Sequence, residues 1–143
     1  LRGGRLPVDE VWRRYFAELR ALARSGLADV LAHPDLVKIF GRRPSSEVVE
    51  ACHEEAAAAI AEAGVAVEVS TAGLRKPVGE LYPDSRFLAR CRERGIGETL
   101  ASDAHDYRDV GRDFDAGVDH LRAAGYETIA VFDGRASSQE RLG

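Results

Sequence analysis

The chain has 143 residues, of which 45% are hydrophobic and 31% charged, and its formal net charge at pH 7 is -4. This length fits one ordinary domain, and the apolar share is high enough for a hydrophobic core. The composition excludes a disordered chain, and the lack of a long apolar run excludes a membrane-spanning helix. The mildly acidic balance argues against a dedicated nucleic-acid binder.

The cysteines and the first residues of the chain bear on the cellular compartment of the protein and on whether a segment preceded this sequence. Cys52 and Cys91 are too few for a disulfide scaffold, and both lie inside helical patterns, which predicts small buried side chains. No secretory signal is visible, so the cytoplasm is the expected compartment. The chain lacks methionine and opens on Leu1-Arg2-Gly3-Gly4, from which we expect that an upstream segment has been removed.

Apolar periodicity predicts helices that alternate with short strands. Ser45 or Ser46 is a good N-cap for the second helix, and Gly26 and Gly64 mark the ends of the first two. The predicted helices cover residues 7–24, 45–64, 85–95 and 114–124, and the predicted strands cover 28–32, 65–69, 98–101 and 128–132. This order predicts an α/β architecture with a parallel sheet, followed by a loose polar tail over 133–143.

Polar side chains follow three successive predicted strands. His33 begins the segment His33-Pro34-Asp35 after the first strand, and Asp103-x-His105 follows the third. The carboxyl ends of parallel strands meet at one edge, where imidazole and carboxylate groups together suit zinc, iron or manganese. Taken singly, His33 is equally consistent with a turn residue, and Asp103 with a helix N-cap.

The second strand carries further polar candidates. Glu68 interrupts an apolar run and faces either the strand-end site or the interior of the fold. Arg75 and Lys76 lie in the following loop, either as solvated residues or as a clamp for a phosphoryl group. His53 and His120 lie in predicted helices, where we expect His53 on the surface and His120 on the surface or partly buried.

Three segments resemble motifs of the PHP superfamily, named for polymerase and histidinol phosphatase, and most closely its histidinol-phosphate phosphatase branch. They are ADVLAHPDLVKIFG (28–41), VEVSTAGLRKPVGELYP (67–83) and TLASDAHDYRDVG (99–111). The resemblance implies that residues 1–132 are the C-terminal half of a distorted (β/α)7 TIM-like barrel with parallel strands. The family's opening His-x-His pair has no counterpart in this chain.

The resemblance also implies the site and its chemistry. His33, Asp103 and His105 match metal ligands, in a family barrel that holds up to three divalent ions (Zn, Mn or Fe). His105 would alternatively protonate the leaving group, and Arg75 matches a residue that contacts the phosphate. The implied activity is metal-dependent hydrolysis of a phosphomonoester, with L-histidinol phosphate as the preferred substrate in histidine biosynthesis.

Two alternatives stay open on the sequence. The chain is either another PHP phosphoesterase, acting on small phosphates or nucleic-acid ends, or a non-catalytic α/β fragment. We expect neither a nucleic-acid nor a membrane partner. Half a barrel would leave open strand edges, which predicts self-association or a need for the missing half.

Overall fold

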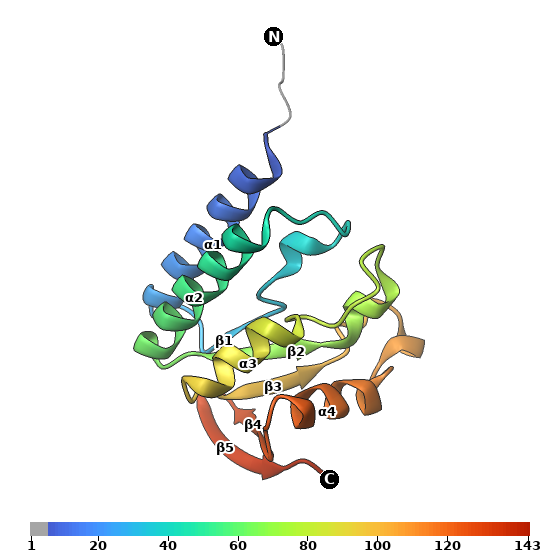
Figure 1. Ribbon diagram of the computed structural model, residues 1–143. Coiled ribbons are helices and arrows are strands. Elements are labelled where there is room, and N and C mark those ends of the chain that lie inside the picture. Colours follow the sequence, from blue (N-terminus) through green and yellow to red (C-terminus); the bar gives the residue numbers. More distant parts are fainter. Residues whose placement is uncertain (1–5) are drawn as a thin grey trace.

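The computed structural model describes residues 6–143 and contains four α-helices and five strands over that range (Figure 1). The helices are α1 (Val8–Arg24), α2 (Ser46–Ala63), α3 (Ser85–Glu93) and α4 (Phe114–Ala123). The strands are β1 (Val30–Leu31), β2 (Ala66–Ser70), β3 (Glu98–Ala101), β4 (Thr128–Asp133) and β5 (Ala136–Arg141). Every predicted helix and strand is present, with boundaries that differ by a few residues.

Local signals in the sequence explain where the helices begin and end. The Ser45 side chain accepts the Val48 N–H at the start of α2, and the Asp84 carboxylate accepts the Phe87 N–H at the start of α3. Gly64 ends α2 in the left-handed conformation with φ 68°, which a residue with a Cβ adopts only at a cost. These caps agree with the predicted helix limits.

Strands β1, β2 and β3 form one parallel sheet in that order. Val67 of β2 pairs with Leu31 of β1 and with Glu98 of β3, so β2 is the central strand. Helices α2 and α3 are the crossover connections between these strands (Figure 1). The mixed α/β class with a parallel sheet is confirmed.

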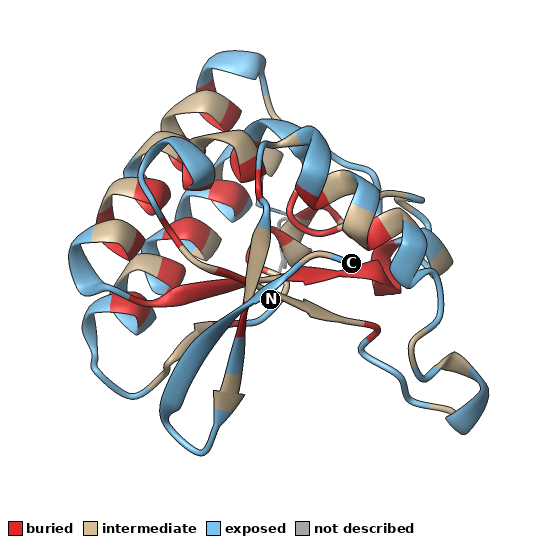
Figure 2. Ribbon diagram, turned by 90° about the horizontal axis from the view of Figure 1, so that it is seen from below, coloured by how far each residue is buried: buried red, intermediate tan, exposed pale blue. Residues whose placement is uncertain are grey.

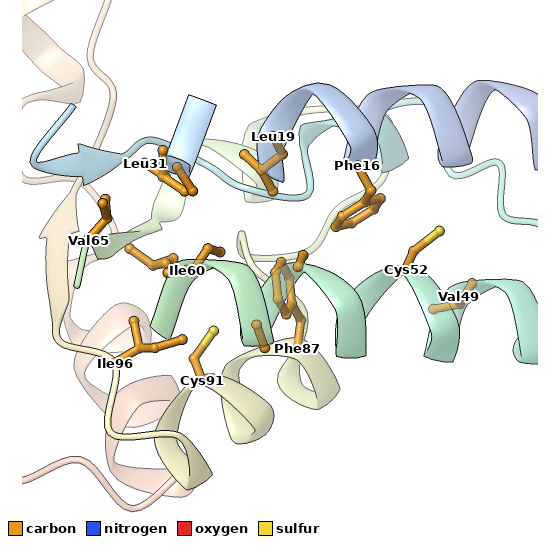
Figure 3. Packing of buried hydrophobic residues seen from close by; sticks show 14 of the residues in the cluster. Phe16, Leu19, Leu31, Val49, Cys52, Ile60, Val65, Phe87, Cys91 and Ile96 are labelled. Carbon is orange, nitrogen blue, oxygen red and sulfur yellow. The ribbon is translucent and has the colours of Figure 1, made fainter. Parts of the chain in front are cut away.

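The main hydrophobic core lies between this sheet and helices α1, α2 and α3 (Figure 3). Phe16, Ile60 and Phe87 are fully buried at its centre and come from the three different helices. Cys52 and Cys91 are buried free thiols in the same cluster, which confirms their predicted role as small core residues. Figure 2 shows buried residues on the faces that the helices turn toward one another.

The end of the chain differs from the prediction. The fourth strand was expected to extend the parallel sheet and the tail to be loose, but β4 pairs with β5 in a separate antiparallel hairpin. The pairing of Asp133 with Ala136 leaves Gly134 and Arg135 as a two-residue turn, and Gly134 has a φ of 59°. A glycine at such a turn position favours a tight hairpin, which is why the polar tail is a strand.

The hairpin lies at the edge of the sheet where the parallel strands begin. Arg135 donates two hydrogen bonds, each 2.9 Å long, to the carboxylate of Asp29 just before β1. All six residues of β5 are exposed, as Figure 2 shows. Within residues 6–143 no helix has the length and hydropathy to cross a bilayer.

Candidate functional site

The carboxyl ends of β1, β2 and β3 lie at one edge of the sheet, because the three strands are parallel neighbours. We call this edge the rim and define it by residues 32–38, 70–82 and 102–113. His33, Arg75, Asp103 and His105 all belong to it. The topology therefore brings the segments that carry the four predicted site residues to the same edge.

His33 adopts an unusual backbone conformation at the rim. Its φ is 32°, in the region that residues with a Cβ rarely occupy. The His33 N–H donates to Glu68 Oε1 at 3.3 Å, and the His33 carbonyl accepts the Tyr15 hydroxyl at 3.5 Å and the Leu36 N–H at 3.0 Å. His33 Nδ1 is buried and has no hydrogen-bond partner in the described chain, so a lone pair or N–H is left unsatisfied there.

Asp103 and His105 follow β3 at the same edge and are exposed. Asp103 also has a positive φ, at 48°. His105 Nδ1 lies 2.9 Å from the carbonyl oxygen of Asp103. When Nδ1 donates to that carbonyl, Nε2 is the nitrogen left to accept a proton or bind a metal.

Backbone strain in the described chain is concentrated at the rim. The residues other than glycine that have a positive φ within 6–143 are His33, Asp103 and Asp113, and all three lie on the rim. Such conformations cost on the order of 1–3 kcal/mol each and are common at functional sites. This observation points to the rim independently of any motif.

Glu68 of β2 contacts His33 and lies near Asp103. Val67 and Val69 pack on the helix side of the sheet, so alternation along β2 directs Glu68 to the opposite face. Burial raises the pKa of Glu68, while the nearby His33 lowers it and Asp103 raises it. Glu68 is thus close enough to His33 and Asp103 for their charges to shift its pKa.

Arg75 is held against the end of β3. Its Nη2 donates to the carbonyl of Ser102 at 2.6 Å, and its guanidinium lies 3.7 Å from Asp109 and 3.8 Å from Asp113. Arg75 Nη1 is buried without a hydrogen-bond partner in the described residues. The structure therefore places the arginine against Ser102, the residue before Asp103, with Nη1 near Asp113 but making no hydrogen bond among the described residues.

The loop that carries Arg75 folds back onto the end of β2. Ser70 and Tyr82 exchange two backbone hydrogen bonds, of 2.8 and 3.1 Å. A Cβ added at Gly73 would lie 1.9 Å from the Glu80 carbonyl oxygen, so only glycine permits this close approach. The tight fold fixes the short helical turn Thr71–Arg75 at the rim.

A buried ion pair joins the first and second rim segments. Lys38 donates to the Leu81 carbonyl at 2.7 Å and lies 3.0 Å from Asp35 and 3.3 Å from Glu80. Asp35 in turn accepts the Asp84 N–H at 2.8 Å. Burial raises the pKa of Asp35, and the Lys38 ammonium opposes that rise.

A candidate metal-binding group that differs from the predicted one includes the rim residue Asp35. Asp35, His53 and Asp84 offer ligand atoms within 4.8 Å of one another. The Lys38 ammonium already neutralises Asp35, and one Asp84 oxygen caps α3. A cation at this group would therefore meet a fixed positive charge. Within the described residues, the predicted ligands His33, Asp103 and His105 do not bring three ligand atoms within 4.8 Å of one another.

The remaining histidines behave differently from each other. His53 was predicted on the helix surface, but it is fully buried and stacks on Phe87 with ring centroids 4.7 Å apart. Burial lowers the pKa of His53 to about 4. His120 is partly exposed, and its Nε2 lies 2.9 Å from the Pro83 carbonyl oxygen.

The comparisons with known proteins agree with this architecture. The chain is 40% identical over 119 residues to a "Probable histidinol-phosphatase" of Deinococcus radiodurans. The chain belongs to the histidinol-phosphatase-like family. That alignment covers 83% of this chain and 45% of the relative.

A solved structure supports the same fold. A Listeria monocytogenes protein provisionally named a histidinol phosphatase matches with a TM-score of 0.66 and 24% identity, over 73% of this chain and 43% of that one. The chain thus spans less than half the length of these two members of the histidinol-phosphatase-like group. No family model matches the sequence.

Proposed function

We propose that this chain carries the C-terminal part of a metal-dependent phosphomonoester hydrolase whose substrate is L-histidinol phosphate. The observation that supports the proposal is that the segments bearing His33, Asp103, His105 and Arg75 end at one strained edge of the sheet. The family relationship supports the reaction class and the substrate.

The residues at the rim fit a divalent metal ion. His33 has an orphaned buried nitrogen, and Asp103 and His105 add a carboxylate and a second imidazole, a donor set suited to zinc, manganese or iron. A divalent ion at such a site supplies an activated water and neutralises charge on the phosphoryl oxygens. In the proposed site these three residues would hold the metal, and up to three ions would bind in the family barrel.

Arg75 and His105 contribute groups of the protein itself. The unused Nη1 donor of Arg75 is suited to bind a phosphoryl oxygen and to offset the negative charge that develops in the transition state. His105 is exposed, so its Nε2 is accessible either to a metal or to the leaving alkoxide, which it would protonate.

The three-stranded parallel sheet is proposed to be part of a distorted seven-stranded barrel. Within the described residues β1 and β3 each have one side without a strand partner. We expect these edges either to pair with further barrel strands or to drive self-association, and light scattering of the purified chain distinguishes an associated form from a monomer. The cytoplasm remains the proposed compartment, because both cysteines are free and buried.

The function is tested by metal analysis combined with phosphatase assays. The purified chain, with and without added Mn²⁺ or Zn²⁺, is assayed for phosphate release from L-histidinol phosphate and from a 5′-phosphorylated oligonucleotide. The proposal expects bound metal and preferential hydrolysis of L-histidinol phosphate, both lost in Asp103→Ala.

The other outcomes identify the competing functions. Faster hydrolysis of the oligonucleotide would favour a different PHP phosphoesterase. A chain that holds no metal and releases no phosphate would be a non-catalytic α/β unit, and the proposed activity would fail for this polypeptide.

A further inference from the structure

Glu68 is the ionisable residue of the central strand, on the face opposite Val67 and Val69. It pairs in register with Thr99 of β3, and its position two residues before the end of β2 sets it just below the rim. It is half-buried, so its carboxylate has lost part of its water shell. A carboxylate in this position needs a hydrogen-bond donor, because burial without one is costly.

The donor is the backbone of His33. Glu68 Oε1 accepts the His33 N–H at 3.3 Å, from a residue 35 positions earlier in the chain. This hydrogen bond joins β2 to the turn that follows β1. It is formed at the residue whose φ of 32° is unfavourable for any side chain with a Cβ.

A strained conformation persists only where neighbouring contacts determine it. The contacts to the His33 backbone come from Tyr15 and Leu36 on the carbonyl side and from Glu68 on the amide side. The ring of Tyr82 stands edge-on to the imidazole, with centroids 6.3 Å apart. Glu68 is therefore the contact that holds the amide side of this turn.

We propose that Glu68 is a positioning residue, which holds His33 in its left-handed conformation and so presents the imidazole to a divalent ion at the rim. The claim that Glu68 holds the conformation of His33 concerns this turn alone. The claim that the imidazole is presented to a divalent ion rests on the proposed function. Glu68 acts through its hydrogen bond to His33, so an uncharged acceptor of the same shape should replace it.

The experiment compares Glu68→Gln, which keeps the acceptor oxygen, with Glu68→Ala, which removes it. Thr99→Ala is the matched control, because it alters the opposite residue on the same face without touching His33. The first readout is made without metal: NMR hydrogen exchange of the His33 amide and the chemical shifts of its ring. We expect at least about tenfold faster amide exchange and shifted ring resonances in Glu68→Ala, with Glu68→Gln and Thr99→Ala close to the unmodified chain.

The second readout is the affinity for Zn²⁺, measured by titration calorimetry. We expect Glu68→Ala to bind Zn²⁺ about 10-fold more weakly, as for other residues that orient a ligand, and Glu68→Gln to retain the affinity. Unchanged His33 exchange and ring shifts in Glu68→Ala would overturn the proposal. Equal loss of Zn²⁺ affinity in both variants with normal His33 exchange would also overturn it, since Glu68 would then be a ligand.

The two proposals fail separately. If the unmodified chain binds no Zn²⁺, the metal site of the proposed function fails for this polypeptide. The amide exchange of His33 then still decides whether Glu68 holds the turn.

Discussion

Lys38 Nζ lies 3.0 Å from Asp35 Oδ2, and neither side chain has any exposed surface. Together with the Leu81 carbonyl and the Asp84 amide, this pair fastens the turn after β1 to the loop after β2. The two rim segments that carry His33 and Arg75 are therefore joined through charges inside the protein. Removal of either charge leaves the other without its partner in a medium of low polarity.

Substitution of Lys38 by methionine should strongly destabilise the chain. The Asp35 carboxylate would remain buried without its countercharge, a change that costs about 3–5 kcal/mol of unfolding free energy. Urea denaturation at pH 7 measures the loss. The control is Arg43→Ala, which removes a partly exposed ion pair with Glu80 and should cost less than about 1 kcal/mol. Similar losses in both variants would contradict a special role for the buried pair.

His53 should make the stability of the chain depend on pH. Its pKa is lowered from 6.5 to about 4 by burial, so the unfolded chain binds a proton there between these values while the folded chain does not. The free energy of unfolding contributed by His53 is therefore present above pH 6.5 and falls as the pH drops toward 4, by about 3 kcal/mol in total.

The matched variant for this effect is His53→Phe, which keeps a ring against Phe87 and cannot be protonated. Denaturant unfolding of both proteins from pH 7 to 4 gives the comparison. The unmodified chain should lose stability relative to His53→Phe over this range, because only the unmodified chain takes up a proton at position 53 on unfolding. Asp35 and the other carboxylates titrate in both proteins, so their effect cancels in the difference. Parallel pH profiles would mean that His53 is not buried in its neutral form.

Gly73→Ala should disturb the loop that holds Arg75. The added methyl would meet the Glu80 carbonyl at 1.9 Å, so the backbone must shift, at a cost of roughly 1–3 kcal/mol. Thermal unfolding measures this, with Gly97→Ala as the control. The nearest atom to a Cβ at Gly97 is 4.0 Å away, and this variant should stay within about 0.5 kcal/mol of the unmodified chain.

Arg75→Lys tests the proposed contact with phosphate. Lysine keeps the charge but lacks the planar fork that reaches Ser102 and leaves a second donor free. If the chain hydrolyses L-histidinol phosphate, we expect kcat/KM to fall about 100-fold. Arg108→Ala should have no effect, since Arg108 is exposed and its hydrogen bonds go to Asp106 in its own loop. A full rate in Arg75→Lys would remove the arginine from the proposed site.

The helices and the parallel strands were predictable because their signals are local. Ser45 and Gly64 bracket α2 with a cap at each end, and β3 has the predicted limits, 98–101. The placement of the segments that carry His33, Arg75 and Asp103 at one edge of the sheet followed from strand order alone. The details of their contacts did not, because they depend on side chains brought together by the loops, such as Lys38 beside Leu81.

Two errors have identifiable physical causes. His53 precedes two glutamates in the sequence, yet it lies on the helical face that also buries Val49, Ala56 and Ala57. This spacing of three and four residues was the better guide. The hairpin of β4 and β5 was missed because β5 is exposed throughout and has no apolar alternation. Gly134 followed by Arg135 was the available signal, since glycine at the first position of a two-residue loop favours a tight turn between strands.

The exposed hairpin gives experimental access to the molecule. All residues of β5 are exposed, and Arg135 ties the hairpin turn to Asp29 at the edge where the parallel strands begin. A chemical label attached to β5 would therefore project into solvent at that edge. A fluorophore on a cysteine introduced at Ser138 would report on binding or association while the rim stays chemically untouched. Because the thiols of Cys52 and Cys91 are buried, the introduced cysteine would be the single position that reacts with the label.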